Sequence, residues 1–213
     1  MVRDRLGVDS RAIPSLDREI VEPMNLPNQL TVARLILTAV FVVCFYLPMV
    51  HHISIAALVF GVASITDYFD GRIARARGIV TNFGKLFDPL ADKILIAAAF
   101  ILLVERGDLP AWVAVVVLSR EFFVTGIRLI AAGQGAILMA EKLGKHKMLW
   151  QIITVSWFLV KQASDEALFS FAKPFYAATP GWVADIIIYF TTFLTLASGF
   201  SYFWKNRQLF NDA

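Results

Sequence analysis

Residues 67–92 read DYFDGRIARARGIVTNFGKLFDPLAD, with hydrophobic segments on both sides. Four carboxylates lie in this stretch, on Asp67, Asp70, Asp88 and Asp92. Residues three or four positions apart share one face of an α-helix, so each pair of acids can lie on one face of its own helix. Two helix ends could then bring all four acids to one point. Buried like charges are costly unless a cation or a proton offsets them, so the stretch predicts a cation site.

The whole chain is far more apolar than an average soluble domain. Of its 213 residues, 58% are hydrophobic and 13% aromatic, and the mean hydropathy is +0.64, which predicts an integral membrane protein of the all-α class. The apolar runs span residues 30–50, 53–66, 86–104, 109–132, 148–160 and 182–204. We interpret them as six transmembrane helices. Three runs are short for a bilayer core of about 30 Å, so we expect their helices to extend into the charged flanks.

The basic residues predict the orientation, because Lys and Arg are retained on the cytoplasmic side. Those expected on the cytoplasmic side are Arg3, Arg5, Arg11, Arg18, Arg72, Arg75, Arg77, Lys85, Lys93, Arg120, Arg128, Lys142, Lys145, Lys147, Lys205 and Arg207. The opposite loops hold Arg106, Lys161 and Lys173. We therefore expect both termini and the four acids on the cytoplasmic side of the inner membrane, at or just inside the membrane face.

Two parts of the chain are expected, a cytoplasmic N-terminal arm over residues 1–24 and a transmembrane domain over residues 25–213. In the arm, Ile13, Leu16, Ile20 and Val21 recur at helical spacing, which favours an interfacial amphipathic helix, with a disordered tail as the alternative. The arm is too long for a typical signal peptide, so the first apolar run should remain as an anchor. The single cysteine, Cys44, excludes an intramolecular disulfide framework.

The residues of the motif suit phosphoryl chemistry. Carboxylate oxygens are hard ligands that favour Mg²⁺ or Mn²⁺, and such cations stabilise the charge that builds on a phosphate during transfer. The small residues Gly71 and Ala74 would let a diphosphate approach the backbone, and Gly84 would let two helices come close. The guanidinium of Arg75 suits a phosphate. Ordinary helix packing and a topology signal are the alternatives for these four positions.

The pattern D-x2-D-G-x2-A-R-x8-G-x3-D-x3-D in this stretch resembles the signature of the CDP-alcohol phosphotransferases, membrane enzymes that make phospholipid head groups. The resemblance implies two metal ions held by Asp67, Asp70 and Asp88 with help from Asp92, which also takes the proton of the incoming alcohol. It also implies a homodimer. The nucleotide contacts that it implies are Gly71, Ala74, Arg75, Thr81, Gly84, Asn28 and Thr31. Asn28 and Thr31 could instead simply cap the first helix.

Three further stretches resemble the members of that family that form phosphatidylglycerophosphate: NLPNQLTVAR at residues 25–34, SREFFVTGIR at 119–128 and GKHK at 144–147. Such enzymes join glycerol 3-phosphate to the phosphatidyl group of CDP-diacylglycerol and release CMP. An anionic acceptor needs a basic pocket, for which we expect Arg120, Arg128 and Lys145, with Arg34 and Lys147 as further cations on the same side. An arginine inside an apolar helix is expensive without a partner, and Glu121 could serve Arg120. The positive-inside bias is the alternative for this set.

Other functions remain open at this point. Within the family, serine, inositol phosphate, phosphatidylglycerol or an aminoalcohol could be the acceptor, and a basic pocket does not exclude inositol phosphate. A cation-coupled transporter could carry intramembrane acids, but it would not need the glycine and Ala-Arg spacing. A non-catalytic membrane scaffold would have no reason to hold four acids. The expected partners are CDP-diacylglycerol, glycerol 3-phosphate and the lipid bilayer. We expect no binding of nucleic acid.

Overall fold

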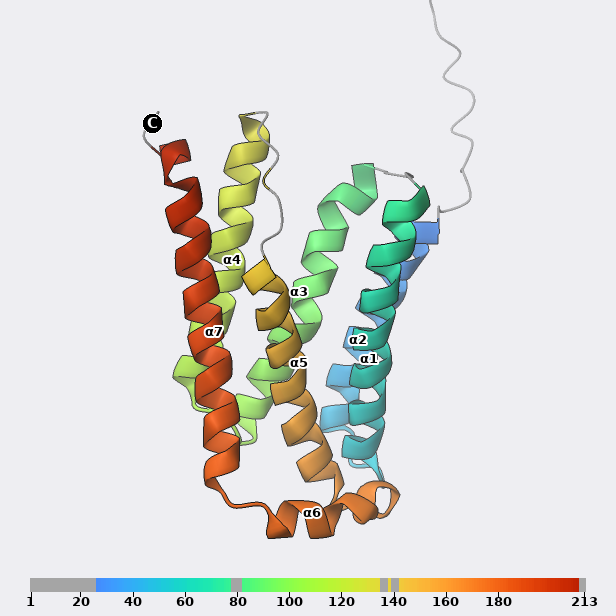
Figure 1. The fold of residues 1–213 in the computed structure, drawn as a ribbon. Coiled ribbons are helices and arrows are strands. Elements are labelled where there is room, and N and C mark those ends of the chain that lie inside the picture. Colours follow the sequence, from blue (N-terminus) through green and yellow to red (C-terminus); the bar gives the residue numbers. More distant parts are fainter. Residues whose placement is uncertain (1–25, 78–81, 135–137, 139–141, 211–213) are drawn as a thin grey trace, which may run out of the picture.

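The fold is a bundle of long helices (Figure 1). The computed structural model describes residues 26–77, 82–134, 138 and 142–210, with only the backbone described for residues 26–31, 67–77, 82–92, 142, 209 and 210. Within these residues all regular structure is helical, as the sequence predicts. The elements are α1 (Leu26–Tyr46), α2 (His52–Arg77), α3 (Asn82–Glu105), α4 (Ala111–Gly133), α5 (Lys142–Ala163), η1 (Ala167–Ala172), α6 (Lys173–Ala178), α7 (Trp182–Asn206) and η2 (Arg207–Phe210). The arm at 1–24, with its expected amphipathic helix, lies outside the described residues.

Each of the six apolar runs corresponds to one long helix, and the extension of the short runs is confirmed. The run at 53–66 continues as α2 to Arg77, and the run at 148–160 begins as α5 at Lys142. The first helix ends earlier than expected, because α1 ends at Tyr46 and not near residue 50. Pro48 explains the difference, since proline has no N–H donor and disfavours helical geometry at the residue before it.

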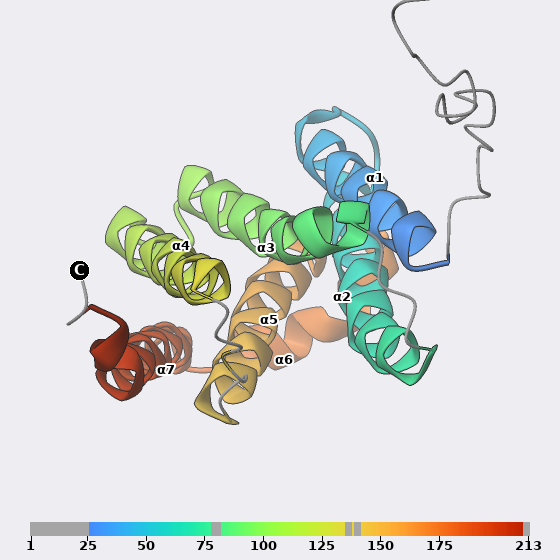
Figure 2. The same cartoon turned by 90° about the horizontal axis from the view of Figure 1, so that it is seen from above.

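The long helices alternate in direction along the chain. One end of the bundle holds the start of α1, the end of α2, the start of α3 and the ends of α4 and α7 (Figure 1). The start of α5 faces the same end but lies farther inside the bundle. Seen along the bundle, α5 lies centrally, with α2 on one side and α7 on the other, and α4 lies beside α7 (Figure 2). The acidic stretch is thus at the same end as the basic flanks of α4, α5 and α7.

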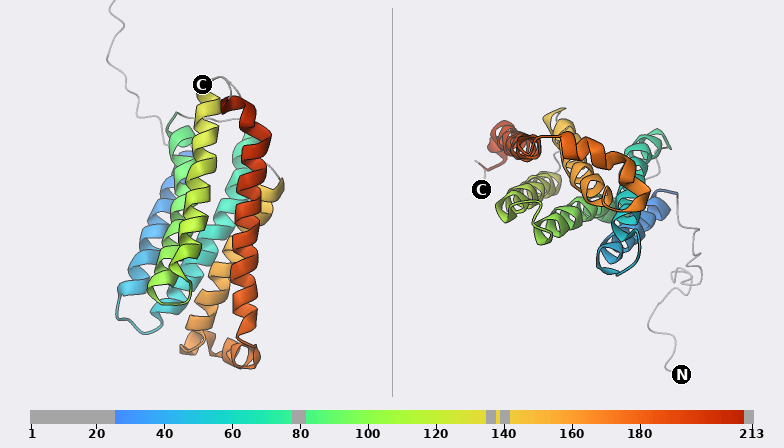
Figure 3. Two further views of the ribbon diagram at one scale, coloured as in Figure 1. Left: turned by 90° about the vertical axis from the view of Figure 1, so that its left-hand side faces the viewer. Right: turned by 90° about the horizontal axis from the view of Figure 1, so that it is seen from below.

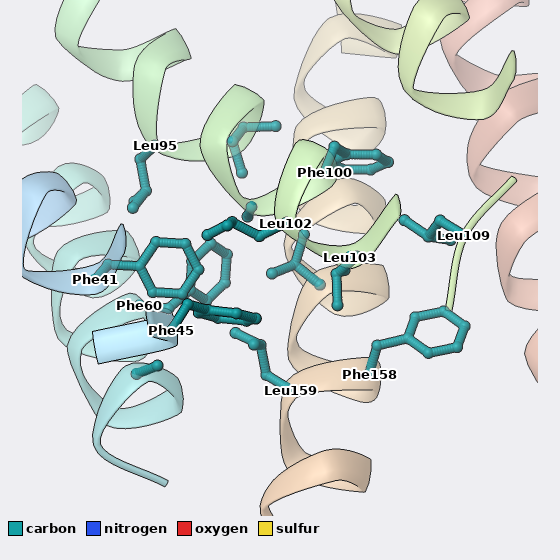
Figure 4. Packing of buried hydrophobic residues seen from close by; sticks show 14 of the residues in the cluster. Phe41, Phe45, Phe60, Leu95, Phe100, Leu102, Leu103, Leu109, Phe158 and Leu159 are labelled. Carbon is teal, nitrogen blue, oxygen red and sulfur yellow. The ribbon is translucent and has the colours of Figure 1, made fainter. Parts of the chain in front are cut away.

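The hydrophobic core lies between α1, α2, α3 and α5, toward the end opposite the acidic stretch (Figure 4). Phe41, Phe60, Phe100 and Leu103 have no exposed surface there. The rings of Phe41 and Phe45 pack edge to face, with centroids 5.3 Å apart. This core holds α2 and α3 in place at one end and leaves their motif-bearing ends for the site.

At the end of the bundle away from the acidic stretch, η1 and α6 connect α5 to α7 and run across the bundle (Figures 1 and 3). The six apolar runs do not include residues 167–178 and so did not predict these two short elements. The carboxylate of Glu166, just before η1, accepts hydrogen bonds from the backbone N–H groups of Ile53 and Ser54, at 3.0 and 2.8 Å. The first turn of α2 is therefore capped by a residue more than a hundred positions away.

The outer surface of the bundle is largely apolar. Along α7 the exposed side chains include Ile186, Tyr189, Phe193, Leu196 and Phe200. Of the helices whose residues the structure describes, α7 has the length and composition to cross a membrane. Shorter apolar segments cover Val32–Tyr46 in α1 and His52–Thr66 in α2.

Candidate active site

The four acids of the motif lie on two consecutive helices. Asp67 and Asp70 are in the second half of α2, and Asp88 and Asp92 are in the first half of α3. Both pairs therefore have the helical periodicity on which the sequence prediction depends. Four residues join Arg77 to Asn82, and an extended chain spans at most about 3.6 Å per residue, so the two helix ends are within roughly 18 Å. The acid side chains themselves are outside the described part of the structure.

The expected nucleotide contacts fall on three helices. Gly71, Ala74 and Arg75 follow the first acids on α2, and Gly84 lies in the first turn of α3. Asn28 and Thr31 are in α1, which is already helical at Leu26. Thr31 is therefore in the second turn and does not cap the helix. Thr81 lies outside the described residues.

A cluster of buried charges joins α4 to α5. The carboxylate of Glu121 accepts a hydrogen bond from Lys147 Nζ, and Arg120 Nη1 lies 3.4 Å from the same oxygen. Glu121 is 9% exposed and Lys147 5% exposed. Lys93, one position after Asp92 on α3, is within electrostatic reach of Glu121. The cluster thus places cations from α3, α4 and α5 around one carboxylate, beside the helix that carries Asp88 and Asp92.

Two glycines let the Arg120 side chain pass between neighbouring helices. A Cβ atom on Gly199 of α7 would lie 3.0 Å from Arg120 Cγ, and one on Gly144 of α5 would lie 3.8 Å from Arg120 Nη2. The first distance is too short for any side chain without a shift of the arginine. Arg120 therefore runs from the surface of α7 to the first turn of α5.

Arg128 is anchored separately, on α7. Its Nε donates a hydrogen bond to Tyr202 Oη at 3.1 Å, and its guanidinium carbon lies 5.5 Å from the centre of the Tyr202 ring. The tyrosine is buried. Arg128 lies eight positions after Arg120, which corresponds to about 12 Å along α4.

The two lysines of the GKHK segment differ in environment. Lys145 is exposed, whereas Lys147 is buried against Glu121. We expected Lys145 together with Arg120 and Arg128, and this set stays a prediction. The structure shows in addition that Lys147 shares the Glu121 carboxylate with Arg120. The position of Lys147 directly before the apolar run of α5 could have predicted its pairing, since a charge at the edge of an apolar segment needs a buried partner.

The donor set of the motif fits a divalent cation. Four aspartates supply only hard oxygen ligands, which Mg²⁺ and Mn²⁺ prefer. Among the side chains that the structure describes, no group of three or more His, Cys, Asp or Glu residues could hold a metal. The four aspartates of residues 67–92 lie outside that set of side chains.

A profile of CDP-alcohol phosphatidyltransferases matches residues 24–197, from the start of α1 into α7. The chain belongs to the CDP-alcohol phosphatidyltransferase family. Enzymes of this family are membrane-bound and generally use divalent metal ions. The match includes the motif and the Arg120–Glu121–Lys147 cluster.

Several bacterial relatives of this CDP-alcohol phosphatidyltransferase have named activities. A CDP-diacylglycerol–glycerol-3-phosphate 3-phosphatidyltransferase of Bacillus subtilis (strain 168) is 43% identical over 197 residues, covering 86% of this chain and 96% of the relative. A protein of that name from Rickettsia felis is 34% identical, covering 87% and 97%. A probable phosphatidylglycerophosphate synthase of Mycobacterium tuberculosis is 41% identical over 139 residues, covering 64% and 66%.

Proposed function

We propose that this chain transfers the phosphatidyl group of CDP-diacylglycerol to glycerol 3-phosphate, with release of CMP and formation of phosphatidylglycerophosphate. The similarity to the Bacillus subtilis enzyme over nearly the full length of both chains carries this proposal. The intact spacing of the eight motif positions supports it, because each acid and glycine has a role in moving a phosphoryl-linked group.

The proposed topology has six membrane-spanning helices, α1 to α5 and α7. An even number of crossings leaves the start of α1 and the end of α7 on one side, together with the motif. The basic residues at that end make it the cytoplasmic side of the inner membrane. The arm at 1–24 would then be cytoplasmic, with an amphipathic helix at the membrane surface, and a homodimer is the proposed assembly.

In the proposed mechanism, Asp67, Asp70 and Asp88 would hold two Mg²⁺ or Mn²⁺ ions with help from Asp92. Bound there, the ions supply charge stabilisation for the diphosphate and its leaving group. Asp92 would accept the proton of the acceptor hydroxyl as that oxygen bonds to the phosphorus of the phosphatidyl group, while the bond from this phosphorus to the bridging oxygen breaks and CMP leaves. A carboxylate of ordinary pKa is a weak base for an alcohol, and its position beside the attacking oxygen is what makes it useful.

The remaining motif residues would orient the donor. Gly71 and Ala74 leave room for the diphosphate at the backbone of α2, and Arg75 pairs with its charge. Gly84 allows α3 to approach α2. The nucleotide contacts are completed by Thr81 and by Asn28 and Thr31 at the start of α1.

The acceptor phosphate is proposed to bind at the cytoplasmic ends of α4 and α5, through Arg120, Arg128 and Lys145. Arg120, Lys147 and Lys93 gather around the Glu121 carboxylate, which supports a positive environment for an anion. A dianionic acceptor would otherwise be repelled by the four carboxylates, whose metals offset them only in part. Serine would not need this charge, whereas inositol phosphate would.

Purified protein in mixed micelles tests the assignment. CMP release is measured with CDP-diacylglycerol and one acceptor at a time: glycerol 3-phosphate, inositol phosphate, serine or phosphatidylglycerol. We expect the fastest release with glycerol 3-phosphate. A preference for another acceptor would overturn the assignment of the acceptor and leave the phosphotransfer chemistry intact.

The metal site has its own test in the same assay. Substitution of Asn for Asp67, Asp70 or Asp88 removes an anionic ligand and should abolish turnover, as should excess chelator. Asp92→Asn should lower turnover by roughly 100-fold or more while CDP-diacylglycerol binding largely survives, because general base catalysis is worth about that much. Full turnover in excess chelator would refute the metal-dependent mechanism.

A further inference from the structure

A groove of about 720 Å³ lies between α4 and α7, within the size range of ligand-binding clefts. Its walls are formed by residues at helical spacing on the two helices, Val116, Ser119 and Phe123 on α4 and Gly199, Phe200 and Phe203 on α7. Phe200 is 66% exposed and Phe123 47% exposed, so the groove opens on the outer surface of the bundle. In the proposed topology this surface faces lipid.

The groove is apolar except at Ser119 and Arg120, and Arg120 carries the only charge among the described residues that line it. The stem of this arginine lies against Gly199, and its guanidinium reaches toward Glu121 and the first turn of α5. The groove therefore runs from the lipid-facing surface to the positive cluster at which the acceptor phosphate is proposed to bind.

We infer that this groove holds one acyl chain of the CDP-diacylglycerol substrate during transfer, an inference that rests on the proposed function. A diacyl lipid carries its phosphate next to its chains, and here an apolar groove meets a cationic group in the same way. A chain seated between α4 and α7 would leave its phosphorus on the side of the bundle from which the acceptor arrives. A partner protein would meet little polar surface here, since Val115 and Leu196, which complete the described lining of the groove, are exposed and apolar.

Narrowing the groove tests the inference. Ser119 is exposed in the groove and has no part in the proposed chemistry, so Ser119→Phe fills space without removing a site residue. Leu129→Phe is the matched control, since Leu129 is 66% exposed on the same helix and lies outside the groove. The apparent KM is measured in mixed micelles for dioleoyl and for dihexanoyl CDP-diacylglycerol. The six-carbon chains of the dihexanoyl substrate are too short to fill the groove.

We expect Ser119→Phe to raise KM for the dioleoyl substrate about 3- to 10-fold and to leave the dihexanoyl substrate nearly unchanged. The effect is moderate because a chain leaving the groove returns to other apolar chains, so that only the difference in packing is lost. Leu129→Phe should change neither value. Equal effects of Ser119→Phe on the two substrates, or none, would overturn the inference. A wild-type protein that releases no CMP from either substrate would overturn the proposed function itself.

A second measurement on the wild-type protein applies if Ser119→Phe does not fold. CDP-diacylglycerol with a photoreactive group at the end of one chain should label residues 115–123 and 196–203, and excess dioleoyl CDP-diacylglycerol should suppress the labelling. Labelling that the excess substrate does not suppress would assign the groove to bulk bilayer lipid, and labelling elsewhere would refute a chain in this groove.

Discussion

A single carboxylate, that of Glu121, holds two cations inside the bundle. The side chains of Arg120, Glu121 and Lys147 are each no more than 11% exposed. Charges removed from water are tolerated only when paired, and loss of one partner leaves an uncompensated charge behind. Glu121 is therefore a structural requirement for the cations beside the site.

Replacement of Glu121 by Gln should destabilise the protein by about 3–5 kcal/mol, the usual cost of breaking a buried pair. Thermal unfolding in detergent, followed by circular dichroism, measures the effect. Asp165→Asn is the control, because its partner Lys173 lies 2.9 Å away in an exposed pair that should contribute less than about 1 kcal/mol. Similar losses in the two variants would show that burial does not govern the stability of the Glu121 cluster.

Among the elements, the start of η1 is joined to the start of α2 by Glu166, at the end of the bundle away from the acids. The first turn of α2 has N–H groups without helical partners and the positive end of the helix dipole, and Glu166 supplies both acceptor and charge. Burial alone would raise the pKa of the Glu166 carboxyl, but the hydrogen bonds from Ser54 and Ile53 outweigh it and hold the pKa below its ordinary value of 4.5.

The sign of the resulting pH dependence follows from this lowered pKa. The ionised carboxylate stabilises the fold at pH values above 4.5, and this contribution is lost as the pH falls through the lower folded-state pKa. Glu166→Gln should cost about 1–2 kcal/mol at neutral pH, as loss of a helix cap does, and should reduce the acid dependence of stability. Thermal unfolding between pH 3 and pH 7, which spans roughly the range of carboxylate titration, checks this. The exposed neighbour variant Asp165→Asn should behave like the wild type, and an unchanged acid dependence in Glu166→Gln would contradict the prediction.

The close approach of α4 and α7 at Gly199 leaves no room for a side chain beside Arg120. A methyl group at residue 199 would lie 3.0 Å from Arg120 Cγ, so Gly199→Ala should displace Arg120 and raise KM for glycerol 3-phosphate severalfold. Gly126→Ala on α4 is the matched control, because no atom lies within 4 Å of its added methyl group. That control should keep its kinetics and gain up to about 1 kcal/mol from helix propensity. Normal glycerol 3-phosphate dependence in Gly199→Ala would argue against a role of Arg120 in acceptor binding.

For the whole molecule, the alternation of helix directions gathers the basic residues of α4 and α5 at the end that carries the acids (Figure 1). Lys145 and Lys147, both in the first turns of α5, have different expected roles because their environments differ. Lys145 is exposed and can meet an anion, whereas Lys147 is occupied by Glu121.

Lys145→Gln and Arg128→Gln should each raise KM for glycerol 3-phosphate by roughly 10- to 150-fold, since a charge-assisted contact is worth about 1.5–3 kcal/mol. KM for CDP-diacylglycerol should change little. Lys147→Gln should instead lower the melting temperature, because it removes the buried cation that donates a hydrogen bond to Glu121. Steady-state kinetics and thermal unfolding of the same preparations separate the two effects. Variants of Lys145 and Arg128 that keep normal kinetics but insert in mixed orientation would identify these residues as topology signals.

Much of the helical framework could be predicted from the sequence, because it depends on local patterns. The apolar runs predicted the long helices, with the short runs extending into their charged flanks, and Pro48 accounts for the early end of α1. The short elements η1 and α6 were missed, since their stability depends on packing against the bundle more than on a periodic pattern. Trp157 of α5, for example, packs edge to face against Phe175 and Tyr176.

The sequence by itself determined the class of protein and its chemistry: a membrane-embedded helical chain with four acids at the spacing of a phosphotransferase motif. These features are local in the chain, since hydropathy and helical spacing act over a few turns. Only the tertiary structure decided which partners meet across long separations. It paired Lys147 and not Lys145 with Glu121, placed Glu166 at the first turn of α2, and formed the groove beside Arg120. Such choices follow from how helices pack, because the low dielectric of the interior and the fit of side chains act only once distant segments are side by side.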